Sequence, residues 1–288
     1  MSNTQSQPEK ANAFRVMHRG PKILVLPNVW DVASARIVEE SGYEAIATTS
    51  AGVAFSLGYP DGERIPREEM LARIARIAKA VKLPVTADVE AGYGGRPEDA
   101  ARTAREVIEA GAIGMNFEDG AEDPAHPLID LNLQLERIRA IRETALKSGV
   151  LLVLNARTDT YLLQVGPPEN RYDETVRRLI AFRDAGADCV FAPVLKDSET
   201  IRRLVTDVRC PLNILAGPGS PTILQLEELG VARVSLGSSP MRATLGLLKR
   251  LAEELRTVGT YGALEGAPAH ADVNRMMAQS QSPGSDRV

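Results

Sequence analysis

The 288-residue sequence lacks the features that mark several classes of protein. Its two cysteines, Cys189 and Cys210, are not spaced like a metal site or a redox pair, so both are predicted to be buried packing residues. No apolar run reaches the ~18 residues that a membrane-spanning helix needs. Residues 1–10 are polar and unlike a signal peptide, so we expect a cytoplasmic protein without a membrane partner. With a net charge of −4 and no basic run, nucleic acid is not expected as a partner either.

What the sequence does contain is a unit that repeats eight times: a short apolar run, a polar turn and a charged stretch of helical periodicity. In the charged stretches apolar residues recur at i, i+3 and i+4. Glycines such as Gly149 and Gly186 follow them, where a left-handed helix cap is expected. The predicted strands are residues 23–28, 45–49, 85–90, 114–118, 151–157, 189–193, 213–216 and 233–236.

Strands that are continuous apolar runs, each followed by a helix, predict a parallel sheet that is covered on both faces or closed on itself. The count of eight favours an α/β fold of the (β/α)₈ TIM-barrel type over residues 21–258. We expect a polar segment and a helix in residues 1–20 and a mobile tail in residues 259–288. A doubly wound open sheet is the alternative, but the glycines at 92, 94 and 95 do not follow the G-x-G-x-x-G spacing.

Polar side chains follow the first five predicted strands, and active sites of barrels lie at the carboxyl ends of strands. Asp88 and Glu90 end the third strand one residue apart, so on a strand both carboxylates would leave the same face. Glu118 ends the next strand. Three carboxylates suit Mg²⁺, with Mn²⁺ as the alternative metal. A pair of solvated charges at a strand end is the competing interpretation of Asp88 and Glu90.

Two further groups suit an anionic small-molecule substrate. Arg157, at the end of the fifth strand, offers a planar guanidinium to a carboxylate or a phosphonate. Ser50, Ala51 and Gly52 follow the second strand and offer a hydroxyl and backbone N–H groups to an oxyanion. With a metal, these groups would hold a 2-oxo acid and stabilise its enolate.

The motifs at these strand ends resemble those of the isocitrate lyase and phosphoenolpyruvate mutase superfamily. They are Thr48-Thr49-Ser50-Ala51-Gly52-Val53, Leu57-Gly58-Tyr59-Pro60-Asp61, Asp88-Val89-Glu90-Ala91-Gly92-Tyr93-Gly94, Asn116-Phe117-Glu118-Asp119 and Asn155-Ala156-Arg157-Thr158-Asp159. The resemblance implies Mg²⁺-dependent making or breaking of a C–C or P–C bond next to a pyruvate enolate.

The same resemblance assigns roles to individual residues. It implies a metal site at Asp88, Glu90 and Glu118, with Glu90 standing where the family usually has aspartate. It implies catalytic roles for Ser50, for Arg157 and for Asp61, the last as a gating residue. Substrate contacts are implied for the segment from Ser50 to Gly52, for Asn155 and for Arg157.

Departures from the family's motifs narrow the expected function. Residues 119–128 lack the C-G-H loop of the lyases that act on isocitrate or methylisocitrate, and lack the lysine and asparagine of the mutases and phosphonopyruvate hydrolases. We therefore expect a lyase or decarboxylase that acts on a small 2-oxo or 2-hydroxy dicarboxylate, with oxaloacetate first. The alternatives are a C–P mutase or hydrolase on a phosphonopyruvate-like substrate and a non-catalytic barrel that binds a small acid.

The resemblance also implies a homo-oligomer, a tetramer or a dimer, in which the last helix is swapped onto a neighbouring subunit. The leucines of residues 245–255 allow this and equally allow packing on the same barrel. Of the histidines, His18 is expected to be solvated, and His126 is expected to be an exposed loop residue or, less favoured, a loop base.

Overall fold

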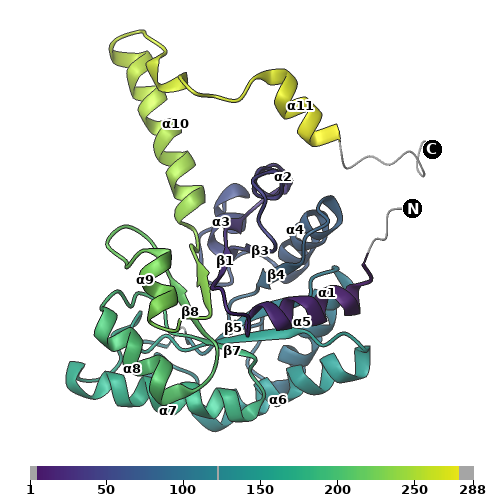
Figure 1. The fold of residues 1–288 in the computed structure, drawn as a ribbon, viewed down its shortest axis with the longest axis vertical. Coiled ribbons are helices and arrows are strands. Elements are labelled where there is room, and N and C mark those ends of the chain that lie inside the picture. The colour runs from purple at the N-terminus through teal and green to yellow at the C-terminus, as the bar shows by residue number, and fades with distance from the viewer. Residues whose placement is uncertain (1–4, 122, 279–288) are drawn as a thin grey trace.

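A ring of parallel strands forms the centre of the computed structural model, which describes residues 5–121 and 123–278 (Figure 1). The strand order is β1-β9-β8-β7-β6-β5-β4-β3-β2, and the predicted TIM barrel is confirmed. The strands are β1 (Leu24–Leu26), β2 (Asn28–Val29), β3 (Ile46–Thr48), β4 (Val85–Asp88), β5 (Gly114–Glu118), β6 (Val153–Arg157), β7 (Cys189–Phe191), β8 (Leu212–Leu215) and β9 (Arg233–Ser235).

The first predicted strand is divided at Pro27, which accounts for nine strands in place of eight. Proline has no N–H to donate to a ladder, although its carbonyl still accepts a hydrogen bond from the N–H of Ala47 at 3.2 Å. On one side of Pro27, β1 pairs with β9, and on the other side β2 pairs with β3. One short segment therefore joins the first and last strands and closes the ring.

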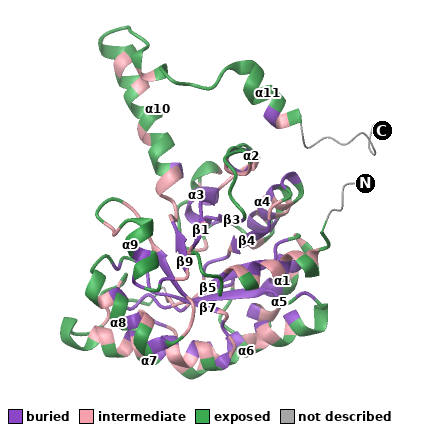
Figure 2. Ribbon diagram, in the orientation of Figure 1, coloured by how far each residue is buried: buried purple, intermediate pink, exposed green. Residues whose placement is uncertain are grey.

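Helices cover the outside of the ring, and buried residues gather in the strands and on the inward helix faces (Figure 2). The helices are α1 (Gln7–Met17), α2 (Val32–Glu40), α3 (Ser50–Ser56), α4 (Arg67–Ala80), α5 (Pro97–Glu109), α6 (Leu131–Ser148), α7 (Pro168–Ala185), α8 (Ser198–Val208), α9 (Ile223–Glu228), α10 (Ser239–Thr257) and α11 (His270–Ala278), with a short 3₁₀ helix, η1 (Gly262–Leu264). The left-handed caps expected at Gly149 and Gly186 are present, with φ of 73° and 116°. Across the described chain, no helix combines the length and apolar character that crossing a bilayer requires.

The chain leaves the barrel at α10, which projects away from the strands in Figure 1. The buried residue of this helix is Met241, near its start, while Leu247 and Leu248 are 44% and 60% exposed. Beyond α10, the expected mobile tail contains ordered elements over its described part. In α11, Met276 is buried, and this helix contacts α2, so apolar burial gives this part of the tail a place to pack. Residues 279–288 lie outside the described residues.

The expectation that His18 is solvated is wrong. His18 is 4% exposed, its Nδ1 lies 2.8 Å from the carbonyl oxygen of Phe14, and its ring packs edge-on to the Phe14 ring. Burial, together with the nearby guanidinium of Arg233, lowers the pKa of His18 to about 3. The helix periodicity of α1 therefore buries a neutral histidine against the barrel.

This burial predicts a pH-dependent loss of stability that His18→Asn removes. The folded chain keeps His18 neutral, whereas the unfolded chain binds a proton below the ordinary pKa of 6.5, so stability falls as the pH drops from 6.5 towards 3. Between pH 7.5 and pH 5 we expect the native protein to lose about 2 kcal/mol more than the His18→Asn variant, measured by urea unfolding. His126→Asn, at an exposed site, is the control and should keep the native pH dependence. Equal losses in native protein and His18→Asn would contradict the prediction.

Candidate active site

A cleft of about 520 Å³ opens where the strands reach their carboxyl ends. Five of the residues predicted for the site line it, namely Ser50, Asp61, Glu90, Glu118 and Arg157. Asp159, Arg137, Leu162 and Leu163 also belong to its wall. Ala51, Gly52, Asp88 and Asn155 are not part of the lining, so the cleft contains part of the predicted set.

Arg157 is held between two carboxylates in this cleft. The parallel register of β5 and β6 puts Glu118 beside Arg157, and Nη1 of Arg157 lies 2.6 Å from Oε2 of Glu118. Nε of Arg157 lies 2.6 Å from Oδ1 of Asp159. Burial opposes the charged guanidinium, but Glu118 and Asp159 raise the pKa of Arg157, which therefore stays charged. The N–H groups that these two contacts do not use remain for a substrate anion.

Asp88 accepts hydrogen bonds from Ser50, whose donors were predicted to bind a substrate oxyanion. Ser50 begins helix α3, and its N–H and Oγ donate to Oδ2 of Asp88 at 2.9 and 2.8 Å. The N–H of Gly52 donates to Oγ1 of Thr49 at 3.3 Å, as a helix cap. The segment from Ser50 to Gly52 thus fixes Asp88 and the start of α3, and Ser50 alone of the three reaches the cleft.

Asn155 lies inside the barrel, below the cleft. It precedes Arg157 by two residues on β6, is fully buried, and donates from Nδ2 to Oδ1 of Asn116 at 2.7 Å. Asn116 in turn donates to Oδ1 of Asp88 at 3.5 Å, and the buried Arg233 donates to Oδ1 of Asn116 at 3.3 Å. Asn155 therefore supports Asp88 through Asn116 and does not face the space where a substrate would bind.

The prediction that Asp88 and Glu90 leave the same face of a strand is wrong. Strand β4 ends at Asp88, and Glu90 has a left-handed φ of 52°. The chain turns here, because the N–H of Gly92 bonds to the carbonyl of Val89 at 2.9 Å. The Glu90 carboxylate reaches across the cleft, where Oε2 accepts from the backbone N–H of Glu63 at 2.6 Å.

Crowding of negative charge is the main electrostatic property of the cleft. Burial, together with the carboxylates of Asp88 and Asp61, raises the pKa of Glu90 to about 8. Partial burial and Asp88 also raise the pKa of Asp61. Burial raises the pKa of Glu118 despite the opposing charge of Arg157. A hard divalent cation prefers oxygen ligands, and its charge would relieve the repulsion between these carboxylates, so the residues present suit such a cation.

The geometry limits how many protein ligands such a cation has. Within residues 5–121 and 123–278, no three His, Cys, Asp or Glu side chains lie close enough together to hold a metal ion. The structure therefore does not assemble Asp88, Glu90 and Glu118 into a three-carboxylate cluster, since each carboxylate already has a protein partner. Mg²⁺ in enzymes is commonly bound through one or two carboxylates and several waters, and this arrangement agrees with the donors present.

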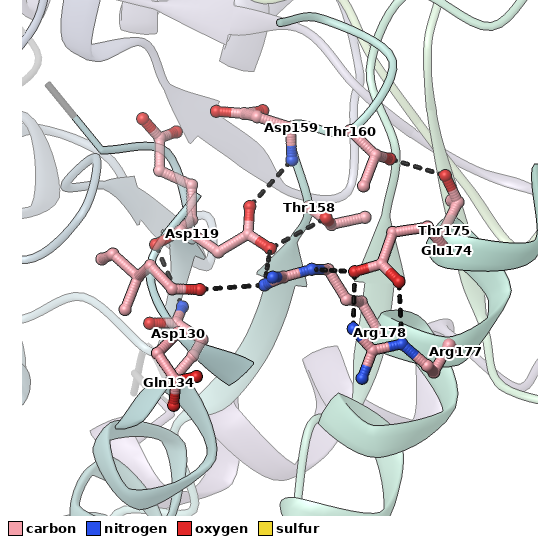
Figure 3. A network of polar contacts seen from close by, with 12 residues as sticks. Asp119, Asp130, Gln134, Thr158, Asp159, Thr160, Glu174, Thr175, Arg177 and Arg178 are labelled. Carbon is pink, nitrogen blue, oxygen red and sulfur yellow. Dashed lines mark hydrogen bonds and ion pairs between the residues drawn. The ribbon is translucent and has the colours of Figure 1, made fainter. Parts of the chain in front are cut away.

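A buried network under the cleft was missed by the sequence argument (Figure 3). Asp119, at 0% exposure, accepts hydrogen bonds from the Thr158 hydroxyl at 2.8 Å and from the Asp159 N–H at 2.9 Å. Nη1 of Arg178, from α7, lies 3.1 Å from Oδ2 of Asp119 and also donates to the carbonyl of Ile129. Asp119 thereby fixes the residues that follow Arg157.

Arg137 and Glu63 were missed as well. Arg137 of α6 is fully buried over the Phe117 ring and donates to the carbonyls of Ala91 and Gly94, so it holds the turn after Glu90. A signal for it existed, because Arg137 occupies an inward position of α6 beside the buried Ile138 and Ile141. Glu63 lies in a polar loop and gives no comparable signal.

With this geometry established, comparison with known proteins identifies the family. Residues 14–256 match the family described as phosphoenolpyruvate phosphomutase, and the chain belongs to that family. An uncharacterized protein of Mycobacterium tuberculosis (strain ATCC 25618 / H37Rv) is 39% identical over 81% of this chain and 84% of its own. The 2-methylisocitrate lyase of Bacillus subtilis (strain 168) is 30% identical over 74% of this chain and 69% of its own. The structure of an oxaloacetate acetylhydrolase with its product oxalate has a TM-score of 0.82 at 26% identity, covering 93% of this chain and 94% of that one.

The network in Figure 3 predicts a large effect of Arg178→Met on stability. The substitution leaves the Asp119 carboxylate buried without its cation, so we expect a loss of about 3 to 5 kcal/mol in urea unfolding. Arg177→Met on the same helix is the matched control, because Arg177 is 55% exposed and also pairs with Glu174. It should cost less than about 1 kcal/mol. Equal losses in the two variants would contradict the role of Asp119.

Proposed function

We propose that this chain is a Mg²⁺-dependent carbon–carbon lyase that acts on a small 2-oxo or 2-hydroxy dicarboxylate, with decarboxylation of oxaloacetate as the first candidate. The observation that carries the proposal is the charged Arg157 guanidinium, fixed by Glu118 and Asp159 at the wall of an acidic cleft. A guanidinium beside carboxylates that need a cation suits a substrate with a carboxylate next to an oxo group.

The metal would be held by acidic side chains in the lining of the cleft and directly beside it. Asp88 and Glu118, at the ends of β4 and β5, are the ligands that we favour, and Glu90 was predicted as the third. When bound, Mg²⁺ would polarise the oxo group of the substrate. Mn²⁺, which also binds carboxylate oxygens, is the alternative metal.

The residues of this chain bind and enclose the substrate. Arg157 would bind a substrate carboxylate, while Leu162 and Leu163 form an apolar part of the wall that limits the access of water. Decarboxylation needs no dedicated acid or base beyond the enolate site, and His126 does not line the cleft. Its side chain is 83% exposed and pairs with Asp123, which speaks against the loop-base hypothesis.

The proposal predicts release of pyruvate from oxaloacetate by the purified protein with Mg²⁺. We expect Asp88→Ala to lower kcat/KM by about a hundredfold or more, because removing Asp88 takes away a metal ligand and leaves the Ser50 donors unpaired. A lactate dehydrogenase-coupled assay measures pyruvate directly. Oxaloacetate decarboxylates slowly by itself with metal ions, so substrate and Mg²⁺ without protein supply the background for both the native protein and the variant.

A thermal-shift measurement with oxalate controls for an intact binding site. Oxalate mimics a pyruvate enolate, and an oxaloacetate acetylhydrolase of similar fold binds it. Oxalate with Mg²⁺ should raise the melting temperature of the native protein and not of Arg157→Ala. If the protein releases no pyruvate and oxalate causes no shift in melting temperature, the lyase proposal is contradicted and a non-catalytic scaffold is favoured. If the protein turns over phosphonopyruvate but neither oxaloacetate nor any of a panel of 2-alkylmalates, C–P chemistry is favoured.

We also propose that the chain forms a homo-oligomer, a dimer or a tetramer, through α10. This helix projects from the barrel, and Leu245, Leu248 and Leu255 are 45%, 60% and 45% exposed in the single chain. Apolar side chains repeated on one projecting helix are costly to leave in water. Docking of α10 on a neighbouring subunit would bury them.

Leu248→Glu is predicted to lower the molar mass of the protein in light scattering after size-exclusion chromatography. A charge placed at the interface is costly to desolvate, so we expect the mass to approach that of one chain, 31.1 kDa. Leu146→Glu, at a 68% exposed leucine of α6, is the matched control and should leave the mass unchanged. A native protein that is monomeric at all concentrations would contradict self-association.

A further inference from the structure

Glu63 and Glu90 join two segments that lie far apart in the sequence and meet at the cleft. Oε2 of Glu90 accepts the backbone N–H of Glu63 at 2.6 Å. In return, Oε1 of Glu63 accepts the backbone N–H of Tyr93 at 2.7 Å. Each glutamate side chain therefore bonds to the backbone of the other segment, and the two contacts form a reciprocal clasp between residues 57–65 and residues 89–94.

The backbone of the clasp adopts conformations that its residues would not choose alone. Glu63, Glu90 and Tyr93 have φ of 56°, 52° and 57°, in the left-handed region that disfavours side chains other than glycine. Strained residues of this kind persist only where surrounding contacts over-determine the structure, and they cluster at functional sites. Here the surrounding contacts are the two hydrogen bonds of the clasp, together with Arg137, which holds the carbonyls of Ala91 and Gly94.

The clasp determines where Asp61 lies. Segment 57–65 is anchored at its start, where the N–H of Tyr59 bonds to the carbonyl of Ala54 at 3.0 Å, and at its end, where Ile65 is buried. Between these anchors, the contact with Glu90 holds the middle of the segment against the cleft. Asp61, two residues before Glu63, is thereby brought close enough to Arg157 and Asp88 for their charges to act on its carboxylate.

The hydrogen bond between Glu90 and the N–H of Glu63 depends on the length of the Glu90 side chain. An aspartate at this position would be one methylene shorter and, from the same backbone position, would leave the N–H of Glu63 without its acceptor. The other oxygen of Glu90, Oε1, is buried and has no hydrogen-bond partner within the described chain. The carboxylate is thus directed to segment 57–65 through one oxygen, and a role as a metal ligand would compete with that contact.

We propose that Glu90 is a positioning residue that latches segment 57–65 over the cleft through the N–H of Glu63 and so holds Asp61 at the substrate. The importance of Asp61 for turnover rests on the proposed lyase function, whereas the latch itself is a property of the chain without substrate. In this proposal the Glu90 side chain holds segment 57–65 in place, and the metal is bound by Asp88 and Glu118 without Glu90.

Two substitutions of Glu90 separate a latch from a metal ligand. Glu90→Gln keeps the length and an oxygen that accepts from the Glu63 N–H, but removes the charge. Glu90→Asp keeps the charge and shortens the side chain, and aspartate tolerates a left-handed φ better than glutamate does, so the variant is expected to fold. Circular dichroism and the melting temperature check folding in both.

A latch predicts that the shorter variant is the damaged one. In hydrogen exchange read by mass spectrometry, peptides covering residues 57–65 should exchange about tenfold faster in Glu90→Asp than in native protein, and at nearly the native rate in Glu90→Gln. The affinity for Mn²⁺ alone, measured by calorimetry, should stay within about threefold of native in both variants. If oxaloacetate is turned over, Glu90→Asp should raise KM more than it lowers kcat. Glu68→Asp, the same change at an exposed position of α4, is the matched control.

A metal ligand predicts the opposite pattern. In that case Glu90→Gln would weaken Mn²⁺ binding by about tenfold or more, while Glu90→Asp would keep it. Unchanged exchange of residues 57–65 in Glu90→Asp, or faster exchange in Glu90→Gln alone, would overturn the latch. Exchange and Mn²⁺ binding need no turnover, so an inactive protein with the predicted exchange pattern would contradict the lyase and leave the latch standing.

Discussion

The concentration of negative charge at the carboxyl ends of β4, β5 and β6 is the constraint on which the rest of the site depends. Carboxylates withdrawn from water are costly unless each meets a cation or N–H and O–H donors. Ser50 donates hydrogen bonds to Asp88, Arg157 forms ion pairs with Glu118 and Asp159, and Arg178 forms an ion pair with Asp119. Because the donors come from α3, β6 and α7, charge balance ties the positions of these elements together.

The barrel was predictable because its strands are continuous apolar runs, a property that depends on local sequence alone. Features that depend on distant partners were not predictable. The division at Pro27 follows from pairing with strands β9 and β3, and the end of β4 at Asp88 follows from a turn stabilised by Arg137. The leucine pattern of α10 was compatible with packing on its own barrel and with packing on a neighbouring subunit. Periodicity shows that a helix has an apolar face but not which surface that face contacts.

Part of the site was predictable for a similar reason. Ser50, Glu118 and Arg157 were visible because a polar residue directly after an apolar run is unusual, and all three line the cleft. Arg178 and Glu63 were not visible, because charged residues are ordinary on helices and in loops and only the fold shows which of them are buried or paired. Glu90 was predicted from its residue type, but the predicted direction of its side chain was wrong, because β4 ends at Asp88 and does not continue through Glu90.

The division of the first strand at Pro27 also bears on how the chain is made. Leu24 pairs with Arg233, so the ring cannot close until β9 has been synthesised, and closure brings together the ends of a loop of about 200 residues. Until then β1 has no partner strand, and an unpaired strand of this kind can pair with other chains. Pro27 limits this unpaired stretch to the three residues of β1, because a neighbouring strand cannot pair continuously across it. Pro27, which lets one segment pair with two different strands, thus also shortens the stretch that other chains could pair with before the barrel closes.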